Sequence, residues 1–406
     1  MLDTKTIQII QSTIPVLKTE GVKITSHFYK TMFRDHPELL NLFNHANQKQ
    51  GRQQTALANA AYLAAQHMDR LEEILPVVTQ IAHKHRSLGV LPEHYPIVGR
   101  YLLQAIRDVL GDAATPDILD AWGRAYDVIA GAFIGVEQEL YAQADHLWGG
   151  WSGFRAFTVQ RKEIESSVIT SFYLVPEDGG ALAAFQPGQY VSVKVHIPGE
   201  EFEQIRQYSL SAGPQHDYYR ISVRRADGNG IYPAGKVSMY LHRQVQEGDV
   251  LWLSAPAGDF ALQRQQERPI VLLSGGVGLT PITSMLHALL EKPLQQPVVF
   301  IHATHDGEHH ALREEIAQWE QQEPLLSVYY CYTAPNEQDR SEQRFHREGY
   351  MEMEWLQRIL SHPTEAEFYF CGPLGFMKEM HHILEQWGVP VERRHYEFFG
   401  PAAALV

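Results

Sequence analysis

The stretch LPVVTQIAHKHRSLGV, residues 75–90, decides how the first third of the chain folds. An apolar stripe at helical spacing runs through it, formed by Val78, Ile81 and Ala82. One turn further along, at i+7, stands His85, whereas His83 falls outside the stripe. The period predicts an amphipathic helix that directs His85 into a core. A buried histidine is more often a hydrogen-bonded core residue than a metal ligand, so this stretch alone leaves both interpretations open.

The segments on either side of this stretch also show helical spacing. Asp3 is suited to cap the first helix, and two further helices follow residue 90, the second of them long. The stripes before residue 75 are formed by Ile7, Ile10, Ile14 and Leu17, by Ile24, Phe28, Tyr29 and Met32, and by Gln53, Leu57, Ala60 and Ala61. Since no β-rich run interrupts residues 1–147, we predict an all-α domain there.

Length, charge and cysteine content restrict the class of protein. A chain of 406 residues is long enough for two to three domains, and its net charge of −14 argues against nucleic acid as a partner. Two cysteines, Cys331 and Cys371, predict a reducing, cytoplasmic location. We find no signal peptide and no apolar run of about 18 residues, so no transmembrane segment is expected. The histidine pairs 309–310 and 381–382 favour exposed helix positions over metal sites.

Residues 148–264 change to short β-branched and aromatic runs separated by turn residues, which predicts a small antiparallel barrel. Within it, the motif RQYS offers three groups that a flavin dinucleotide needs. Arg206 supplies a bidentate cation for pyrophosphate, Tyr208 a flat face and Ser209 a donor for an isoalloxazine ring. The motif GKVS, residues 235–238, lies at a helix start, where backbone N–H groups hold phosphate. Taken singly, each motif is more often a strand or a cap.

Residues 265–406 alternate strands with helices, which predicts a doubly wound parallel sheet. The loop SGGVGLTP, residues 274–281, follows the apolar strand IVLLS and precedes a helix, the context of a nucleotide loop. The motif CGP, residues 371–373, ends a later strand. Ligands of such sheets bind at the carboxyl ends of strands, so the two loops support each other. A tight turn and a buried thiol are the alternatives.

RQYS, GKVS, GGVGLTP, CGP and a terminal YEFFG occur in this order over residues 153–402, and as a set they resemble the ferredoxin–NADP reductase-like family of flavoproteins. The resemblance implies an FAD domain followed by a nicotinamide domain. The implied FAD-binding residues are Tyr190, Arg206, Gln207, Tyr208, Ser209, Gly235, Val237, Ser238, Glu397, Phe398, Phe399, Gly400 and Pro401. The implied NAD(P)H-binding residues are Gly275, Gly276, Val277, Gly278, Leu279, Thr280, Pro281, Cys371, Gly372 and Pro373.

The residues after the second strand of this domain bear on which nicotinamide is used. A bare ribose suits an acidic partner, whereas a 2′-phosphate requires arginine. Asp306 and Glu308 stand there, and the next arginine is Arg313. We therefore expect NADH, with NADPH left open.

The helical region resembles a second known module. HFYKTMF, LFNHANQKQGRQQTALANA, IAHKHRSLGVLPEHYPIVG and DAWGRAYDVIAGAFIGVEQELY, followed by the reductase set, resemble flavohaemoglobins across essentially the whole chain. The resemblance implies haem b with His85 as the proximal iron ligand. It implies the catalytic residues Tyr29 and Gln53 on the distal side and Tyr95 and Glu137 on the proximal side, and the haem-packing residues Phe28, Phe43 and Leu57. Glu137 continues an apolar stripe, so it points inwards.

The implied activity is that of a nitric oxide dioxygenase, with nitric oxide, dioxygen and NAD(P)H as small-molecule partners. NADH gives two electrons, ferric haem takes one, and FAD must therefore lie between them. Dioxygen would bind the haem beneath Tyr29, react with nitric oxide and leave as nitrate. A haem protein that stores or senses dioxygen, and a flavin reductase or peroxidase-like enzyme with auxiliary haem, are the alternatives. The sequence leaves open the oligomeric state and a lipid or azole ligand in the distal pocket.

Overall fold

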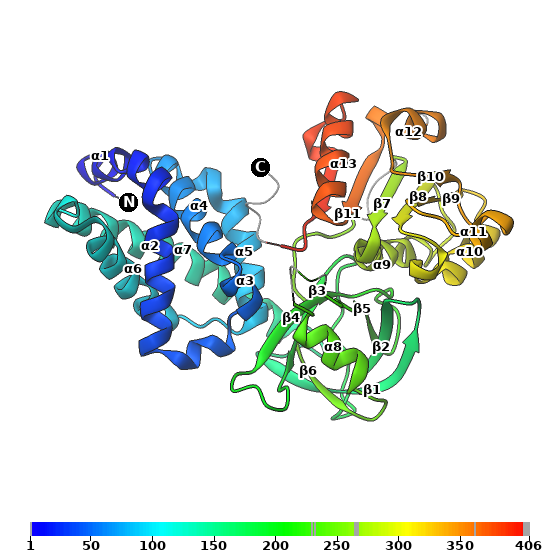
Figure 1. The fold of residues 1–406 in the computed structure, drawn as a ribbon, viewed down its shortest axis with the longest axis horizontal. Coiled ribbons are helices and arrows are strands. Elements are labelled where there is room, and N and C mark those ends of the chain that lie inside the picture. The colour runs from blue at the N-terminus through cyan, green and yellow to red at the C-terminus, as the bar shows by residue number, and fades with distance from the viewer. Residues whose placement is uncertain (1, 229, 231–232, 264–267, 361–362, 401–406) are drawn as a thin grey trace.

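The computed structural model describes residues 2–228, 230, 233–263, 268–360 and 363–400. Figure 1 shows a helical unit at the N-terminus, then a curved antiparallel sheet, then a parallel sheet flanked by helices. This order confirms the predicted succession of an all-α, a barrel-like and a doubly wound α/β region. The domain boundaries at 147/148 and 264/265 stay predictions, and residues 264–267 lie outside the described residues.

The helices of the first unit pack their apolar faces around a shared core. Their bounds are α1 Thr4–Ser12, α2 Ile14–Asp35, α3 His45–Lys49, α4 Arg52–Gln66, α5 Leu75–Leu88, α6 His94–Leu110 and α7 Pro116–His146. Short 3-10 turns at Pro37–Asn41, Leu71–Ile74 and Gly111–Ala113 lie between them. The fully or nearly fully buried core side chains include Ile10, Ile24, Phe28, Met32 and Trp122.

The predicted first helix, with its stripe over 7–17, is two helices in the structure, because α1 and α2 are separated at Thr13. Pro15 has no N–H to donate to the carbonyl four residues earlier, so the ladder of helical hydrogen bonds is interrupted at this point. The expected cap is confirmed. The Asp3 carboxyl accepts a hydrogen bond of 2.9 Å from the N–H of Thr6.

The second unit is a six-stranded antiparallel sheet with the order β4-β3-β6-β1-β2-β5. Its elements are β1 Phe154–Ile164, β2 Ile169–Pro176, β3 Tyr190–Val195, β4 Gln204–Ser209, β5 Tyr219–Arg224, α8 Lys236–Arg243 and β6 Val250–Ser254. An isolated bridge between Leu210 and Ile221 joins the two edges of the sheet, so it nearly closes into a barrel. Buried aromatic side chains such as Phe157 and Phe172 fill the interior.

The third unit is a parallel sheet with the order β10-β9-β8-β7-β11-β12. Its strands are β7 Ile270–Gly275, β8 Val298–Thr304, β9 Leu326–Tyr332, β10 Arg347–Glu348, β11 Glu367–Cys371 and β12 Arg394–Glu397. Its helices are α9 Leu279–Leu289, α10 Arg313–Gln322, α11 Glu337–Ser341, α12 Met353–Ile359 and α13 Leu374–Gln386. Further 3-10 turns span Gly276–Gly278, Gly307–His309, Pro363–Glu365 and Val391–Arg393. The chain reverses its direction across the sheet between β7 and β11, and ligands of open sheets bind at that switch point.

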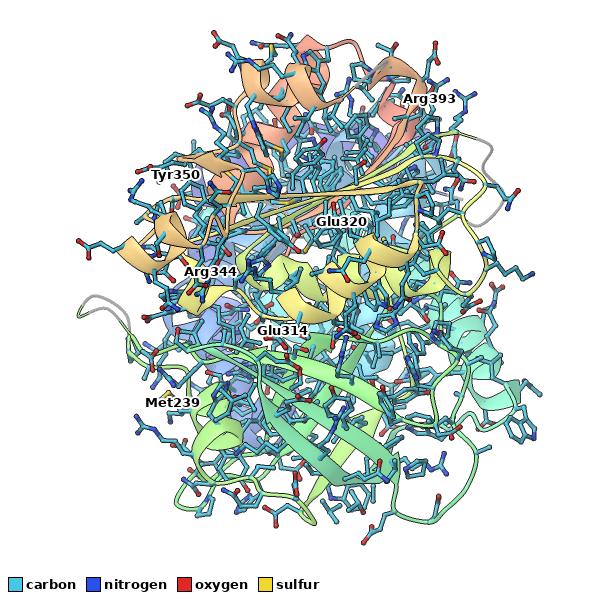
Figure 2. The ribbon with its side chains drawn as sticks, turned by 90° about the vertical axis from the view of Figure 1, so that its right-hand side faces the viewer. Met239, Glu314, Glu320, Arg344, Tyr350 and Arg393 are labelled. Atoms are coloured by element: carbon cyan, nitrogen blue, oxygen red, sulfur yellow. The ribbon has the colours of Figure 1, made fainter. Side chains whose placement is uncertain are left out.

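The parallel-sheet unit is stacked on the barrel, as Figure 2 shows, with α10 and its Glu314 at the boundary. Arg220 of β5 pairs with Glu315 of α10 at 3.0 Å. The Ser284 hydroxyl of α9 donates to the carbonyl of Ala212 at 2.8 Å. Within the described residues, none of the helices combines the length and apolar character needed to cross a membrane.

Candidate active site

Three helices bring His85, Tyr95 and Glu137 together. His85 lies in the last turn of α5, Tyr95 at the start of α6 and Glu137 within α7. The distance from His85 Nδ1 to Glu137 Oε1 is 2.8 Å, and the Tyr95 hydroxyl donates to the same oxygen at 2.6 Å. A proton on Nδ1 that is shared with this carboxyl group leaves the lone pair of Nε2 free for a metal. The predicted proximal set is therefore assembled, and its role toward haem stays a prediction.

Glu137 is an acidic side chain in an almost entirely buried position, with 2% of its surface exposed. Its Oε1 serves both Tyr95 and His85, whereas its Oε2 finds no hydrogen-bond partner within the described part of the chain. Burial and the hydrogen bond to Glu137 raise the pKa of Tyr95, which keeps the phenol protonated as a donor. The arrangement gives the His85 ring a fixed orientation and an anionic neighbour.

The predicted distal residues come from α2 and α4. Tyr29 is 7% exposed, and its ring centroid lies 4.7 Å from that of Phe28 and 5.8 Å from that of Phe43. Burial raises the pKa of Tyr29, and the Gln53 side chain opposes this shift through its interaction with the hydroxyl. Leu57 packs against the same core one turn beyond Gln53. The phenol is therefore a protonated donor in an apolar, aromatic surrounding.

The other face of α5 packs against the barrel. The apolar stripe of the helix did not predict this contact. Arg86 is 6% exposed, and its guanidinium donates to the carbonyls of Ala255, at 3.0 Å, and of Pro256. His83, which lies off the stripe, accepts from the N–H of Gly258 at 3.3 Å. Because the predicted iron ligand lies between these two residues, one helix connects the predicted haem site to the barrel.

A chain of hydroxyl groups joins the RQYS motif to the same helix. The Gln207 amide donates to the Ser192 hydroxyl at 3.1 Å, and the Ser192 hydroxyl donates to that of Ser87 at 2.9 Å. Ser192 and Ser87 are both fully buried. Ser87 and Ser192 are residues that sequence reasoning missed, because a single serine in a strand or helix carries no signal of its partner.

The predicted flavin residues lie on β3 and β4. Pairing places Tyr190 opposite Ser209, and Val191 opposite Tyr208. Alternation along β4 therefore puts Ser209 on the face of Tyr190, and Tyr208 with Arg206 on the other face. The Ser209 hydroxyl is buried and finds no hydrogen-bond partner among the described residues. An orphaned buried hydroxyl fits a cofactor with a hydrogen-bonding edge.

The GKVS motif begins α8 as predicted, with Gly235 as the N-cap. Val237 is 2% exposed and belongs to the barrel core, so its side chain is used for packing and only its backbone is free to meet a phosphate. The Ser238 hydroxyl already bonds within the turn, donating to the Gly235 carbonyl at 3.0 Å and accepting from Ala226 N–H at 3.2 Å. Phosphate binding at this helix start remains a prediction.

The nucleotide loop and the CGP motif meet at the switch point of the parallel sheet. Cys371 pairs with Ser274 of β7 on one side and with Glu397 of β12 on the other. A Cβ added to Gly278 would lie 2.1 Å from the carbonyl oxygen of Cys371, so the two loops touch through their backbones. Thr280 closes the turn by donating to the Val277 carbonyl at 3.0 Å.

The remaining residues of these two motifs surround this contact. A Cβ on Gly275 would lie 3.1 Å from Pro373, and one on Gly372 would lie 2.5 Å from the ring of Phe376. Gly276 has a φ of +53°, in the left-handed region that glycine tolerates. The helix that follows begins with three buried residues, Leu279, Thr280 and Pro281.

The YEFFG motif carries a second acid, Glu397, in a half-buried position. Burial, reinforced by repulsion from Asp259 and opposed by Lys84 of α5, raises the pKa of Glu397 to about 8. Sequence reasoning missed Lys84 and Asp259, since neither stands in a motif. Phe399 is 45% exposed, and Pro401 lies outside the described residues.

The remaining motif residues lie at the same end of the chain. Phe398 packs at the edge of the parallel-sheet core, and a Cβ on Gly400 would lie 2.5 Å from its ring. The FAD role of both residues stays a prediction.

The expectation that both histidines of the pair 309–310 are exposed is wrong. His310 is 4% exposed, and its Nδ1 lies 2.7 Å from the Tyr332 hydroxyl. It follows a 3-10 turn instead of continuing a helix, so the helical periodicity assumed for the pair does not apply. A carboxylate lies next to the other histidine of the pair, since Asp306 Oδ1 lies 2.6 Å from His309 Nδ1.

Three family models match the chain in succession. They are the globin model over residues 26–133, the oxidoreductase FAD-binding domain over residues 156–262 and the oxidoreductase NAD-binding domain over residues 272–382. The succession agrees with the helical, barrel and parallel-sheet units described above.

Solved structures show the same architecture. A flavohemoglobin from Malassezia yamatoensis, determined with bound FAD and heme, matches with a TM-score of 0.84 at 28% identity and covers 98% of this chain and 100% of that chain. The FAD/NAD-binding domain of a nitric oxide dioxygenase from Vibrio cholerae matches with a TM-score of 0.55 at 39% identity, covering 61% of this chain and 99% of that chain.

Two curated proteins match over their full length. A flavohemoprotein of Halalkalibacterium halodurans is 54% identical over 404 residues, which is 100% of this chain and 98% of the relative. A flavohemoprotein of Bacillus subtilis is 50% identical over 405 residues, which is 100% of this chain and 99% of the relative. With its globin, FAD-binding and NAD-binding units in one chain, the protein belongs to the flavohemoprotein family.

Proposed function

We propose that the protein is an NAD(P)H-dependent nitric oxide dioxygenase that converts nitric oxide and dioxygen to nitrate. The observation that carries the proposal is the double role of α5. One side of this helix presents His85 to Glu137, while His83, Arg86 and Ser87 fix the helix to the barrel. A single rigid element therefore lies between the two predicted redox sites. The FAD/NAD-binding domain of the Vibrio cholerae nitric oxide dioxygenase matches the reductase part of this chain, which supports the same activity.

The residues present fit a haem and a flavin. His85 is held by its Nδ1 and has its Nε2 free, and the buried Ser209 hydroxyl finds no partner in the part of the chain that the structure describes. When bound, FAD supplies the conversion of a two-electron hydride donor into single electrons, and haem iron supplies one-electron chemistry toward dioxygen and nitric oxide.

On the proximal side, Glu137 and Tyr95 act on the imidazole. The Glu137 carboxyl group accepts from both partners through one oxygen, so it fixes the ring and increases the basicity of His85. A more basic imidazole donates more electron density to a metal at Nε2. Such donation favours redox chemistry at the metal over simple storage of dioxygen.

On the distal side, Tyr29 supplies a hydrogen-bond donor. Its raised pKa keeps the proton on the phenol, and the aromatic rings of Phe28 and Phe43 lie beside it. A ligand that gains negative charge on binding is stabilised by such a donor in an apolar pocket. The Gln53 side chain interacts with the Tyr29 hydroxyl and so helps to fix its orientation.

On the reductase side, the backbone of the Gly276–Gly278 turn receives the nicotinamide dinucleotide. The turn lies at the carboxyl end of β7, in contact with the end of β11, and open backbone N–H groups at this switch point suit a pyrophosphate. Asp306 at the end of β8 favours NADH over NADPH, because a carboxylate repels a 2′-phosphate.

An assay of nitric oxide consumption tests the proposal. With NADH and dioxygen present, the full-length protein is expected to remove nitric oxide rapidly and to yield nitrate in equal amount. Slow loss limited to one equivalent per protein would instead favour storage or sensing of dioxygen.

The variant His85→Ala distinguishes the proposed dioxygenase from the remaining alternative, a flavin reductase with auxiliary haem. The variant is expected to lose nitric oxide consumption to the background rate and to keep NADH-dependent flavin reduction. His146→Ala, at the exposed end of α7, is the matched control and is expected to keep both. Nitric oxide consumption that survives in His85→Ala would contradict the proposal.

A further inference from the structure

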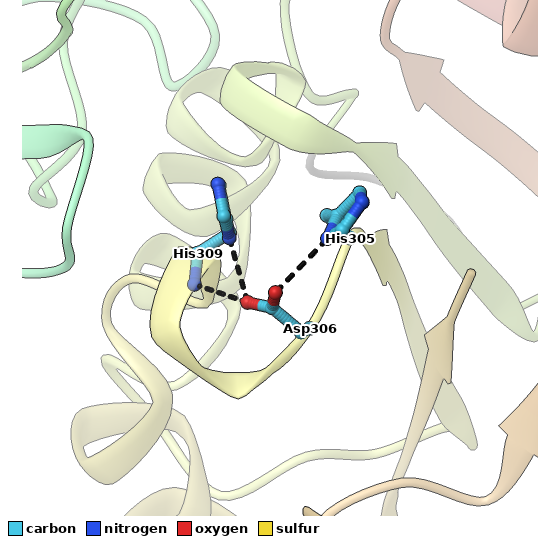
Figure 3. Close-up of side chains that lie close together, drawn as sticks. All are labelled: His305, Asp306 and His309. Carbon is cyan, nitrogen blue, oxygen red and sulfur yellow. Dashed lines mark hydrogen bonds and ion pairs between the residues drawn. The ribbon is translucent and has the colours of Figure 1, made fainter. Parts of the chain in front are cut away.

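Three side chains of metal-ligating type converge at the carboxyl end of β8 (Figure 3). His305 Nδ1 lies 2.9 Å from Asp306 Oδ2, and His309 Nδ1 lies 2.6 Å from Asp306 Oδ1. One ligand atom from each of the three residues lies within 4.8 Å of the other two. We propose that His305, Asp306 and His309 form a binding site for a divalent transition-metal ion of the Zn²⁺ type.

The backbone holds this group in place from several directions. Asp306 Oδ1 accepts from the N–H of His309 at 3.0 Å and so caps the turn Gly307–His309. The Gly307 N–H donates to Asp339 Oδ2 at 3.0 Å, and the His305 carbonyl accepts from the N–H of Ala334 at 2.8 Å. Ligands on a turn that is already fixed lose little conformational entropy when an ion binds.

Burial and charge also favour an ion at this position. The Asp306 side chain is 13% exposed, whereas those of His305 and His309 are 60% and 34% exposed, so the group is open to solvent on the histidine side. Among the described residues, the Asp306 carboxylate pairs with the imidazoles of His305 and His309, neither of which is a permanent cation. A divalent ion would supply that charge.

The donor set selects the class of ion. Two imidazole nitrogens and one carboxylate oxygen are typical ligands of Zn²⁺ and of neighbouring first-row ions, whereas Ca²⁺ and Mg²⁺ prefer oxygen ligands alone. Neighbouring ligand atoms around a tetrahedral ion with bonds of about 2.1 Å lie roughly 3.4 Å apart. The nitrogen–oxygen distances of 2.9 and 2.6 Å would therefore widen by less than about 1 Å when an ion binds. Binding requires only that each Nδ1 turn its lone pair to the ion, with the ring proton on Nε2, and water completes the shell.

The position of the site predicts an effect on the reductase. β8 is the neighbour of β7, and the ribose of a bound dinucleotide lies near the end of the second strand in sheets of this kind. Asp306 is also the residue that we expect to favour NADH. This consequence rests on the proposed function: an ion that engages the Asp306 carboxylate withdraws it from the ribose and weakens NADH binding.

Titration of Zn²⁺ into the tag-free, full-length holoprotein, followed by calorimetry, tests the site directly. The double variant His305→Gln/His309→Gln is expected to lose one binding event or to bind it at least about tenfold more weakly. His382→Gln, an exposed histidine on α13, is the matched control and is expected to bind as the parent does. X-ray absorption at the zinc edge is expected to show two imidazole ligands in the parent. Unchanged affinity and stoichiometry in the double variant would overturn the proposal.

A kinetic measurement tests the consequence. Zn²⁺ at saturation is expected to raise the KM for NADH in flavin reduction several-fold in the parent and to leave that of the double variant unchanged. A KM that stays constant while calorimetry shows Zn²⁺ at these histidines would overturn the effect on NADH. Because the calorimetry needs no nitric oxide, absence of dioxygenase activity with intact Zn²⁺ binding would count against the proposed function alone.

Discussion

The His85 site and the Gly276–Gly278 turn are built from different parts of the chain. In the first, side chains from α5, α6 and α7 meet through hydrogen bonds of 2.6 and 2.8 Å on one oxygen of Glu137. In the second, two loops meet backbone to backbone, with no room for a Cβ at Gly278. The first site depends on particular functional groups and on the hydrogen bonds between them. The second site depends on the absence of a side chain at Gly278.

This difference predicts that the largest loss from a single added methyl group occurs at the turn. Gly278→Ala would place a Cβ 2.1 Å from the Cys371 carbonyl, so one loop must move. A displacement of about 1 Å at a binding loop lowers a rate by about 100-fold, and we expect that loss in NADH-dependent flavin reduction. Gly375→Ala, where no atom lies within 4 Å, is the control and is expected to react normally. A normal rate in Gly278→Ala would show that the loops separate easily.

At the His85 site, a change of one atom is expected to matter without any change of shape. Glu137→Gln keeps the volume but removes the negative charge beside the imidazole. We expect turnover to fall roughly tenfold or more and the iron–histidine stretching frequency to decrease, because the ring donates less electron density. Glu139→Gln, exposed on the same helix, is the control. If both variants give the parental frequency, the Glu137 hydrogen bond does not tune His85.

Tyr29→Phe sharpens the comparison on the distal side, where one hydroxyl is removed from an aromatic surrounding. Loss of a hydrogen bond to a charged ligand is expected to speed dioxygen dissociation by about tenfold and to lower turnover. Flash photolysis or stopped-flow mixing measures the off-rate. An unchanged off-rate would show that the Tyr29 hydroxyl does not stabilise bound dioxygen.

Glu397 gives the smallest expected effect, on stability. Its pKa is raised in the folded protein to about 8 from an ordinary 4.5, so its contribution to stability is fully present below about pH 4.5 and is lost as pH rises toward 8. The melting temperature of the reductase units, followed by flavin fluorescence, is therefore expected to fall between pH 5 and 8. Glu397→Gln is expected to reduce that fall by about 2 °C or more. If the melting temperature of the variant had the same pH dependence as that of the parent, Glu397 would not have a raised pKa in the folded protein.

The sequence predicted the fold well because each unit has its own periodicity. The helical stripe around His85, the short β-branched runs and the strand–loop–helix pattern at SGGVGLTP each gave the correct class of element. Pro15 is the instructive failure. The apolar stripe runs on through it, but a missing N–H ends the first helix all the same.

The candidate site was predicted only in part, because periodicity reports one buried face of an element. The stripe on α5 found His85, whereas Arg86 and Ser87 bond to barrel residues that lie more than a hundred residues further along the chain. Lys84 and Asp259 likewise approach Glu397 only after folding. Val237, inside a cofactor motif, packs its side chain in the barrel core, so its predicted role at the cofactor would fall to its backbone N–H and stays a prediction.

The central claim is that electrons pass from NADH through the flavin to a metal at His85. Anaerobic stopped-flow spectroscopy of the holoprotein mixed with NADH tests it most directly, since flavin and haem absorb at different wavelengths. We predict bleaching of the flavin first, followed by a shift of the Soret band in the same sample, and only the first step in His85→Ala. A flavin that is fully reduced while the Soret band stays in its ferric position would contradict the claim.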